Sequence, residues 1–491
     1  MKRRKQKQET LAAGGELPGA LSLQQNATPT MEDNLTASLL AIAATSLGLG
    51  IHDAEGRFST MAIGCLTTTV IVIGLSIASI YAPRWFKSLP LIGPVLLICM
   101  CAQAAALIGG PINYCAVVEG ASQRAFFAAI WLLPCLAVVL GSSLCSNRSW
   151  FGAWTFPILI VVQVALGLII INWLRMPGID VLAFQDTSCR AFLKGYNPYS
   201  IMFRDAYPPD ISAKLYGPGL SVNGILQFGY LYMPLTLLMA LPGYALGDVR
   251  YAGLACIAAA AVLIAYTRRG SVSKVAGALL AFSPIVPLFI YFAWTESYVI
   301  FLLALTVFCH YRKPKWMPYA LGLLLVSKQY MLGLTPLALL LIPRPWTREK
   351  LLPVALKAAA TGAIVTLPFV LWNPAAFWHS AVTLQMHQPF RLDALSFLVW
   401  AMPTHPENWL WIPFVLFLVM LGVSLIVGAR RAMPFSMALV VTLLLFFASN
   451  KQAFANYYYL LIAALWCSVA IMGRGPAPDG NLPAERACGG P

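Results

Sequence analysis

The chain has 491 residues, of which 59% are hydrophobic and only 10% are charged, and its formal net charge is +15. A soluble globular protein carries about 25% charged residues, so this composition excludes an ordinary soluble domain. Apolar runs long enough to cross a bilayer as helices recur along most of the sequence. They do not alternate as the strands of a membrane β-barrel do. We therefore predict an all-α polytopic membrane protein.

The apolar runs predict about fourteen spans in chain order: 35–51, 60–82, 89–109, 124–145, 152–173, 250–267, 274–292, 296–310, 316–327, 330–342, 352–372, 411–429, 433–449 and 455–472. The pair 316–327 and 330–342 is short, which predicts a helical hairpin that enters the membrane and returns. Residues 230–246 are broken by proline and glycine, so we predict that they lie at the membrane surface.

The same pattern divides the chain into regions. Residues 1–34 and 473–491 are polar and are predicted to be disordered cytoplasmic ends. A four-span extension, 35–145, precedes the main membrane domain, 146–472. This domain has a long outer loop, 175–249, and a second outer loop, 373–410.

The charges are distributed unevenly across this topology. With the N-terminus inside, the cytoplasmic parts hold 22 Lys and Arg against 7 acids, and the outer parts hold 11 against 11. Positively charged residues concentrate on the cytoplasmic side of membrane proteins. We therefore predict that both ends of the chain are cytoplasmic and that the long loop faces the extracytoplasmic side. Anionic lipid headgroups account for the basic balance, so no nucleic-acid partner is implied.

The long outer loop gathers acids, tyrosines and prolines directly after the span 152–173. If 181–194 is helical, Val181, Leu182, Phe184 and Phe192 can face lipid, while Asp186 and Arg190 pair at i, i+4 spacing. Asp180 has no basic residue at that spacing. By composition alone it is either a helix N-cap or a functional carboxylate.

The order of several motifs in this region resembles a known enzyme family. GIDVLAFQDTSCRAFLKGYNPYS places Asp180 at a membrane exit, then a helix, then Gly-x-Asn-Pro-Tyr. YLYMPLTLLMALPGYALGDVRYAGL, FSPIVPLFIYFAWTESYVIFLL and SKQYMLGLTPLALLLIP follow. Together they resemble the GT-C glycosyltransferases, which transfer a sugar from a polyprenyl phosphate carrier, and most closely the bacterial polyprenol-phosphate-mannose-dependent mannosyltransferases.

The resemblance covers roughly 150 to 470 and departs from the family pattern at two places. The family's double acidic motif is absent because Val181 follows Asp180, and Met233 stands where the related pattern has proline. The four spans before the resemblance have no assigned role.

The resemblance implies an inverting hexosyltransferase, with mannose as the expected sugar and a glycan, lipid or protein acceptor. Asp180 is the expected base, because the acceptor hydroxyl must lose a proton as it attacks the anomeric carbon. Cations are needed where the phosphate gains charge. The donor phosphate is assigned to Arg250, Lys328 and Arg391, and other substrate contacts to Glu296, Tyr196, Asn197, Tyr199, Tyr232, His387, Gln329 and Lys451.

Other interpretations of these residues remain open. Arg250 can pair with Asp248 and Lys328 with Glu296 for folding alone, and interfacial tyrosines are often only membrane anchors. His387 and Arg391 share a helical face if that segment is a surface helix. No cofactor is predicted; a divalent cation is compatible with the chemistry, but no metal-binding motif indicates one. A transporter or lipid flippase, or an O-antigen ligase or polymerase with a lipid diphosphate donor, are the alternative functions.

Overall fold

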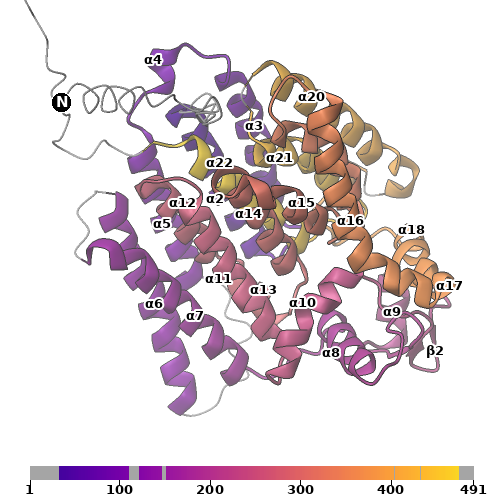
Figure 1. The fold of residues 1–491 in the computed structure, drawn as a ribbon. Coiled ribbons are helices and arrows are strands. Elements are labelled where there is room, and N and C mark those ends of the chain that lie inside the picture. Colours follow the sequence, from indigo (N-terminus) through magenta and orange to yellow (C-terminus); the bar gives the residue numbers. More distant parts are fainter. Residues whose placement is uncertain (1–32, 110–120, 146–150, 403, 432, 475–491) are drawn as a thin grey trace, which may run out of the picture. The chain divides into compact units, whose positions relative to one another are not determined.

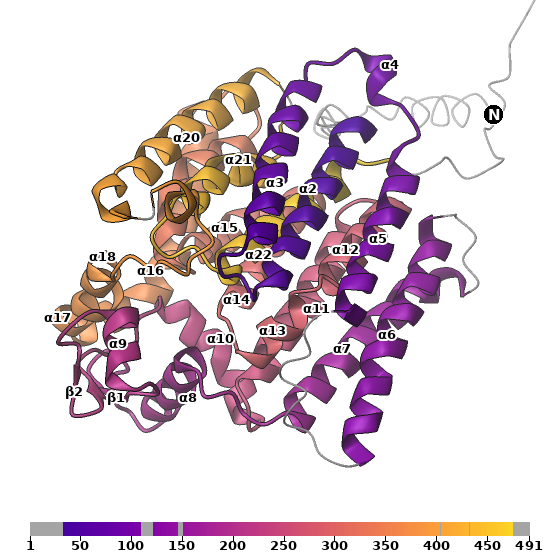
Figure 2. The same ribbon diagram turned by 180° about the vertical axis from the view of Figure 1, so that it is seen from behind.

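The computed structural model describes residues 33–109, 121–145, 151–402, 404–431 and 433–474. Nearly all of the regular structure in this part of the chain is helical (Figures 1 and 2). The predicted disorder of 1–34 and 473–491 falls almost wholly outside the described residues.

Eight helical segments in the described part are long and apolar enough to cross a membrane, judged by length and composition. They coincide with eight of the fourteen predicted spans. Their bounds are Asn34–Asp53 (α2), Thr60–Ser79 (α3), Arg84–Gly109 (α4, Arg84–Lys87, with α5, Ile92–Gly109), Gly152–Trp173 (η2, Gly152–Trp154, with α7, Thr155–Trp173), Arg250–Thr267 (α11), Arg348–Trp372 (α16), Glu407–Arg430 (within η6, Pro406–Trp409, and α20, Ile412–Arg430) and Ala455–Met472 (α22).

The remaining predicted spans are also helical, but most are shorter or interrupted. They are α6 (Ala121–Cys145), α12 (Ser271–Ala281), α13 (Val286–Tyr291), α14 (Glu296–Arg312), α15 (Met317–Leu325), η4 (Gln329–Leu341) and α21 (Phe435–Ala448). The single predicted helix 274–292 is wrong, because residues 282–285 separate α12 from α13. The second arm of the predicted hairpin, η4, forms a 3₁₀-helix.

The two segments predicted to be outer loops, 175–249 and 373–410, carry short elements. The first holds α8 (Asp180–Leu193), β1 (Phe203–Arg204), α9 (Pro209–Tyr216), β2 (Ser221–Val222), β3 (Ile225–Leu226) and α10 (Pro234–Ala245). The second holds α17 (Pro374–Trp378), η5 (His379–Thr383), α18 (Leu384–His387) and α19 (Phe397–Ala401), and η3 (Pro314–Trp316) joins α14 to α15.

A small antiparallel sheet departs from the all-α expectation. Its strand order is β1-β3-β2, with Phe203 and Ser221 both opposite Leu226. Asn223 and Gly224 connect β2 to β3 and both have positive φ. This is the backbone conformation of a tight two-residue hairpin turn, which favours the Asn-Gly pair.

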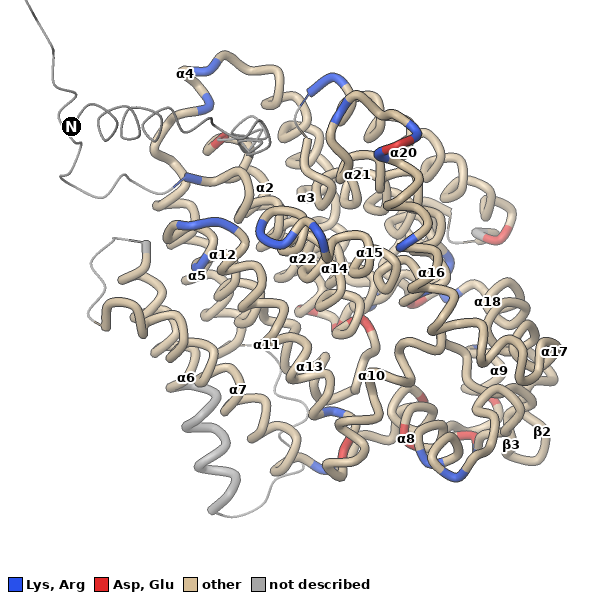
Figure 3. Tube along the Cα trace, viewed as in Figure 1, with Lys and Arg blue, Asp and Glu red and all other residues tan. Residues whose placement is uncertain are grey.

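The charged residues are distributed unevenly along the helices. Figure 3 shows the Lys and Arg residues of α4 and of the α11–α12 connection at one end of the helices. The segment from α8 to α10, with acids and bases together, lies toward the other end. The helices thus present a basic end and a mixed-charge end.

Helix α8 packs into protein on its apolar side. Leu182 and Phe184 are buried, and they belong to two separate clusters that also contain tyrosines of the 199–231 region. Phe192 stacks on Phe369 of α16, with ring centroids 5.5 Å apart. The prediction that these side chains face lipid is therefore wrong. The apolar face of α8 packs against other parts of the protein, including α16.

A close backbone approach joins the Gly-x-Asn-Pro-Tyr motif to the segment before α10. The Tyr230 N–H donates to the Pro198 carbonyl at 2.9 Å, and the Gly229 N–H donates to Ser380 Oγ at 2.9 Å. A Cβ atom at Gly229 would overlap the backbone carbonyl of Tyr199. Only glycine therefore fits at this crossing.

Gly229→Ala tests this crossing. The added methyl group meets backbone atoms, which cannot move aside as a flexible side chain would. We expect the variant to lose at least about 2 kcal/mol of stability, in the range of overpacked cores. Thermal unfolding in detergent measures the loss, and Gly64→Ala is a control because nothing lies within 4 Å of its Cβ position and its φ is not positive. Equal stability of Gly229→Ala and wild type would contradict the contact.

Candidate functional site

Asp180 is the first residue of α8, seven residues after the end of α7. The residue at the N-cap position is Ile179, so the N-cap role is wrong for Asp180. Its Oδ2 accepts a hydrogen bond from the Tyr216 hydroxyl at 2.7 Å, and its Oδ1 accepts from the Val181 N–H at 2.8 Å and from the Tyr207 hydroxyl at 3.4 Å. Two phenols of the same outer loop thus hold this half-buried carboxylate.

The protonation of Asp180 reflects competing effects. Burial raises the pKa of the Asp180 carboxyl, and the hydrogen bonds from Tyr216, Val181 and Tyr207 act against that rise. The positive charge of Arg391 also lowers the pKa, so this residue of the second outer loop lies within electrostatic range of Asp180. The net direction is upward, which makes the carboxylate a stronger proton acceptor than a free Asp.

Tyr216→Phe tests how the phenol controls this carboxylate. Without the hydroxyl, one hydrogen bond that stabilises the charged form is lost, so the pKa of Asp180 rises further. If Asp180 is the predicted base, it works only when ionised, so activity is lost as pH falls through its pKa. We expect the acidic limb of the pH–rate profile to move to higher pH, with less change on the plateau. An unmoved limb would remove Tyr216 from the control of Asp180.

A buried ion pair lies in a second part of this region. Lys328 Nζ is 2.8 Å from Glu296 Oε1, and the two side chains are 6% and 2% exposed. The Asn456 amide of α22 donates to the same Glu296 oxygen at 3.1 Å. Lys328 and Glu296 therefore form the ion pair that the alternative interpretation predicted. A charge pair at such depth is costly to bury and is a functional candidate by default.

Tyr232 connects this ion pair to Asp180. Lys328 Nζ lies 4.4 Å from the centre of the Tyr232 ring, a cation–π contact. Burial raises the pKa of the Tyr232 phenol, and the negative charges of Asp180 and Glu296 both raise it further. The Tyr232 phenol is therefore within electrostatic range of both Asp180 and Glu296, so these two predicted residues lie in the same region of the site.

Gln185 fixes the relation between α8 and α14. Its Nε2 donates to the Ala293 carbonyl at 2.6 Å, and its Oε1 accepts from the Tyr298 hydroxyl at 3.1 Å. Ala293 has φ of 56°, the left-handed region that a residue with a Cβ rarely adopts. This strained residue stands three positions before Glu296, so Gln185 holds the turn from which Glu296 enters α14.

The Gly-x-Asn-Pro-Tyr motif mainly holds the backbone at Tyr232 in place. The Tyr199 side chain is 2% exposed, and its hydroxyl donates to the Tyr232 carbonyl at 2.7 Å. Asn197 Oδ1 accepts the Tyr199 N–H at 2.9 Å. Tyr196 is 63% exposed. Tyr199 and Asn197 therefore position the Tyr232 backbone, while Tyr196 faces outward.

The three cations predicted to hold phosphate each have a carboxylate partner. The Arg250 guanidinium is buried, lies 2.6 Å from Asp248 Oδ2, and donates to the Ile171 carbonyl at the end of α7. Arg391 forms two hydrogen bonds with Asp393, at 2.6 and 2.7 Å. Partial burial acts to raise the pKa of Asp393, but the Arg391 pair lowers it overall. Arg250 thus joins α7 to α11, and the alternative of its pairing with Asp248 is seen.

Lys451 differs from these three cations. Its Nζ donates to the carbonyls of Met386 and Gln388, at 3.0 and 2.7 Å, and within the described residues no carboxylate pairs with it. Burial lowers the pKa of Lys451. The Arg391 N–H donates to the Lys451 carbonyl at 3.0 Å, so the two cations occupy adjacent backbone positions. Of these four cations, Lys451 is therefore the one without a carboxylate partner among the described residues.

Of two further predicted residues, Gln329 connects separate segments and His387 contacts only its own. The Gln329 amide donates to the carbonyls of Leu231 and Ala381, at 3.1 and 2.9 Å, and so connects η4 to both outer loops. His387 is exposed, and its Nδ1 lies 2.8 Å from the Thr383 carbonyl of the preceding turn. His387 and Arg391 do not share a helical face, because α18 ends at His387.

Sequence reasoning missed four residues that shape this site. Tyr207 and Tyr216 hold Asp180, Gln185 holds the turn before Glu296, and Asn456 binds Glu296. The high tyrosine content of the outer loop was visible in the sequence, but nothing indicated which tyrosines reach Asp180. The described residues contain no group of three His, Cys, Asp or Glu side chains placed to hold a metal ion.

Comparison of the chain with protein-family models, with curated proteins and with solved structures gives no match.

Proposed function

We propose that the protein is an integral-membrane glycosyltransferase that transfers a hexose, mannose by resemblance, from a polyprenyl monophosphate carrier to an extracytoplasmic acceptor. The observation that carries the proposal is Asp180. This carboxylate follows a membrane helix, is held by Tyr216 and Tyr207, and has a raised pKa without an ion-pair partner at hydrogen-bond distance among the described residues. Those are the properties of a positioned general base.

The proposed reaction is a single inverting displacement. The acceptor oxygen forms a bond to the anomeric carbon while Asp180 takes the hydroxyl proton. The bond between the anomeric carbon and the phosphate oxygen breaks, and the carrier leaves as a phosphate monoester with one more negative charge. A phosphate monoester is already a good leaving group, so no protein acid is required. The chemistry does require cations near the departing phosphate.

The cation arrangement supports a modified assignment of the phosphate contacts. Within the described part of the chain, the Nζ of Lys451 has only carbonyl partners, so a phosphate oxygen can replace one of them without separating an ion pair. Arg391 is adjacent to it and interacts electrostatically with Asp180. Lys328, which contacts the Tyr232 ring, supplies a third cation for the phosphate. We retain Arg250 in its observed role as a brace between α7 and α11.

We also propose that this site faces the extracytoplasmic side of a cell membrane, with both ends of the chain in the cytoplasm. The basic end of the helices supports this orientation through the positive-inside rule (Figure 3). A cysteine introduced at the exposed Asp210, in a cysteine-free background, should react with an impermeant thiol reagent added from outside. Labelling only after the cytoplasm is opened would reverse the orientation.

The direct test of the proposed activity is transfer from a purified donor. Membranes or reconstituted protein are supplied with radiolabelled polyprenyl-phosphate hexose, and release of sugar to acceptor and of polyprenyl phosphate is followed. We expect transfer by wild-type protein and none beyond background by Asp180→Asn. Counterflow of an intact solute without sugar transfer would contradict the proposal.

A transporter remains the second candidate, and one observation favours it. The buried Glu296–Lys328 pair stands at two helix interruptions, since Glu296 begins α14 after the break that follows α13 and Lys328 lies between α15 and η4. Buried charges and interrupted helices both occur along the substrate paths of transporters. A transporter would show counterflow that depends on Glu296 and Lys328 but not on Asp180. The glycosyltransferase assay with Asp180→Asn separates the two candidates.

A further inference from the structure

The connection between α2 and α3 reaches the second predicted outer loop. The Phe58 N–H donates to the Asp393 carbonyl at 2.9 Å, and Arg57 pairs with Ala394 in an isolated antiparallel β-bridge. The Nε atom of the Arg57 guanidinium also lies 4.0 Å from Asp393 Oδ2. This connection belongs to the four-span extension that precedes the main membrane domain. The extension therefore contacts the carboxylate that holds Arg391.

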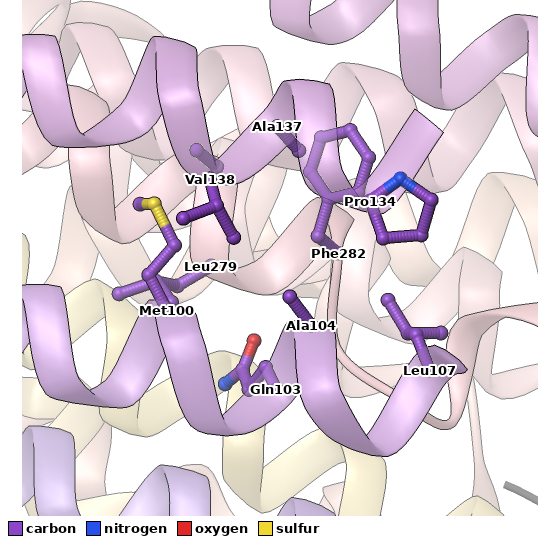
Figure 4. Close-up of a pocket in the computed structure, with 10 residues that line it drawn as sticks. Met100, Gln103, Ala104, Leu107, Pro134, Ala137, Val138, Leu279 and Phe282 are labelled. Atoms are coloured by element: carbon purple, nitrogen blue, oxygen red, sulfur yellow. The ribbon is translucent and has the colours of Figure 1, made fainter. Parts of the chain in front are cut away.

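Helix packing fixes the position of this connection. Helix α2 runs along α22, and at one end the Asp33 N–H donates to the Met472 carbonyl at 3.0 Å. At the other end, Gly56 has a φ of 76°, and a Cβ atom there would overlap the backbone nitrogen of Ala455. Farther along the extension, side chains of α5 and α6 pack against Leu279 of α12 (Figure 4). The connection is therefore held by its backbone, independently of the side chains that it exposes.

Asp393 has two cationic neighbours that differ in distance and exposure. Arg391 donates two hydrogen bonds to it and is 19% exposed, whereas Arg57 is 64% exposed and stands at the limit of ion-pair distance. Partial burial acts to raise the pKa of the Asp393 carboxyl, but Arg391 and, more weakly, Arg57 lower it. The carboxylate therefore stays charged and has a second cation within reach.

The pair with Asp393 limits what Arg391 can do for a phosphate. Asp393 occupies the Arg391 N–H groups at Nε and at one terminal nitrogen. A phosphate bound to the same two donors must displace the carboxylate. Asp393 is half-buried, so losing its closest partner costs free energy. A shift of about 1 Å brings Arg57 to the ordinary length of a charge-assisted hydrogen bond and restores the pairing.

We propose that Arg57 is a positioning residue for the donor phosphate. When Arg391 turns from Asp393 to the phosphate, Arg57 takes over the pairing with Asp393 and does not itself contact the donor. This role rests on the glycosyl transfer proposed above, in which Arg391 binds the phosphate. The rearrangement is an exchange of ion-pair partners, with no covalent step and no proton transfer. It gives the N-terminal extension a part in a site whose other residues lie in the main membrane domain.

The test measures binding of farnesyl phosphate to the full-length protein in detergent by calorimetry, with uncharged farnesol as the comparison. This ligand is a prenyl phosphate monoester without a sugar, so its binding does not require transfer. We expect Arg57→Gln to weaken farnesyl phosphate binding at least about threefold, within the range of an exposed ion pair. Arg57→Lys should retain most of the wild-type affinity, because a point charge is sufficient to pair with Asp393. Equal affinity of Arg57→Gln and wild type would overturn the proposal.

The Asp393→Asn background separates partner exchange from direct contact with the phosphate. In this background Arg391 has no carboxylate to leave, so Arg57→Gln should cause no further loss of affinity. If Arg57 contacted the phosphate directly, Arg57→Gln would weaken binding equally in both backgrounds, and the proposal would be wrong. Because both side chains are partly exposed, each variant should unfold near the wild-type temperature, which shows that it is folded.

A matched control and the transfer assay complete the design. Arg190 is 59% exposed and pairs with Asp186 at 2.8 Å, so Arg190→Gln removes a similarly exposed charge and should leave farnesyl phosphate binding unchanged. In the transfer assay, Arg57→Gln should raise the donor KM with little change in kcat, because the exchange accompanies donor binding. Farnesyl phosphate binding by wild-type protein without sugar transfer would contradict the proposed glycosyl transfer and leave the exchange at Asp393 in place. No preference of wild-type protein for farnesyl phosphate over farnesol would refute the exchange itself.

Discussion

Asp180→Asn is expected to lower the transfer rate at least about a hundredfold, the usual contribution of a general base. The amide has nearly the same volume as the carboxylate, so the fold should persist. It can still accept the Tyr216 hydrogen bond through its oxygen, but it cannot take a proton from the acceptor hydroxyl. Single-turnover transfer from a saturating donor measures the loss, and unchanged thermal unfolding shows that the variant is folded.

Asp186→Asn is the matched control on the same helix. Asp186 pairs with Arg190 at 2.8 Å, and both side chains are substantially exposed. An exposed pair of this kind contributes under about 1 kcal/mol, so neither stability nor rate should change much. If Asp180→Asn retained near-normal turnover, or if the two variants lost activity equally, Asp180 would not be the base.

Lys328→Met is expected to have two separable effects. It leaves Glu296 buried without its ion-pair partner, and breaking a buried pair costs about 3–5 kcal/mol of stability. Loss of a cation near the departing phosphate would separately raise the reaction barrier by about 2–4 kcal/mol. Thermal unfolding and single-turnover rates measure the two effects independently.

The double variant Lys328→Met/Glu296→Gln separates these effects. Neutralising Glu296 removes the uncompensated charge, so expression and stability should recover. If Lys328 acts on the donor phosphate, turnover stays low in the folded double variant. Recovery of turnover together with stability would make the ion pair purely structural and remove Lys328 from the mechanism.

The Arg250–Asp248 pair provides the comparison. Arg250→Leu should destabilise the protein, because it leaves Asp248 buried and removes the contact with the Ile171 carbonyl. Arg250→Leu/Asp248→Asn should recover turnover as well as stability, since the geometry gives Arg250 a bracing role. A folded double variant without activity would return Arg250 to the phosphate site.

Local sequence patterns determined the helices and their approximate bounds. Apolar composition and length identify a helix that can cross a bilayer, because the membrane requires every backbone polar group to be satisfied within the segment. The same reasoning located the pair Asp186–Arg190, whose i, i+4 spacing is a property of one helix. The break at 282–285 was missed, although Ser283-Pro284 and Pro287 are signals of an interrupted helix.

Tertiary structure alone decided which side chains meet. Tyr216 and Tyr207 reach Asp180 only because α9 and the small sheet fold back on α8, and Asn456 reaches Glu296 only because α22 packs against α14. These contacts join residues 27 to 160 positions apart. Hydropathy and spacing report the local environment of a residue, whereas such contacts depend on how whole elements pack. The sequence therefore singled out Asp180, Glu296 and Lys328 as unusual, while only packing distinguished braced cations from Lys451.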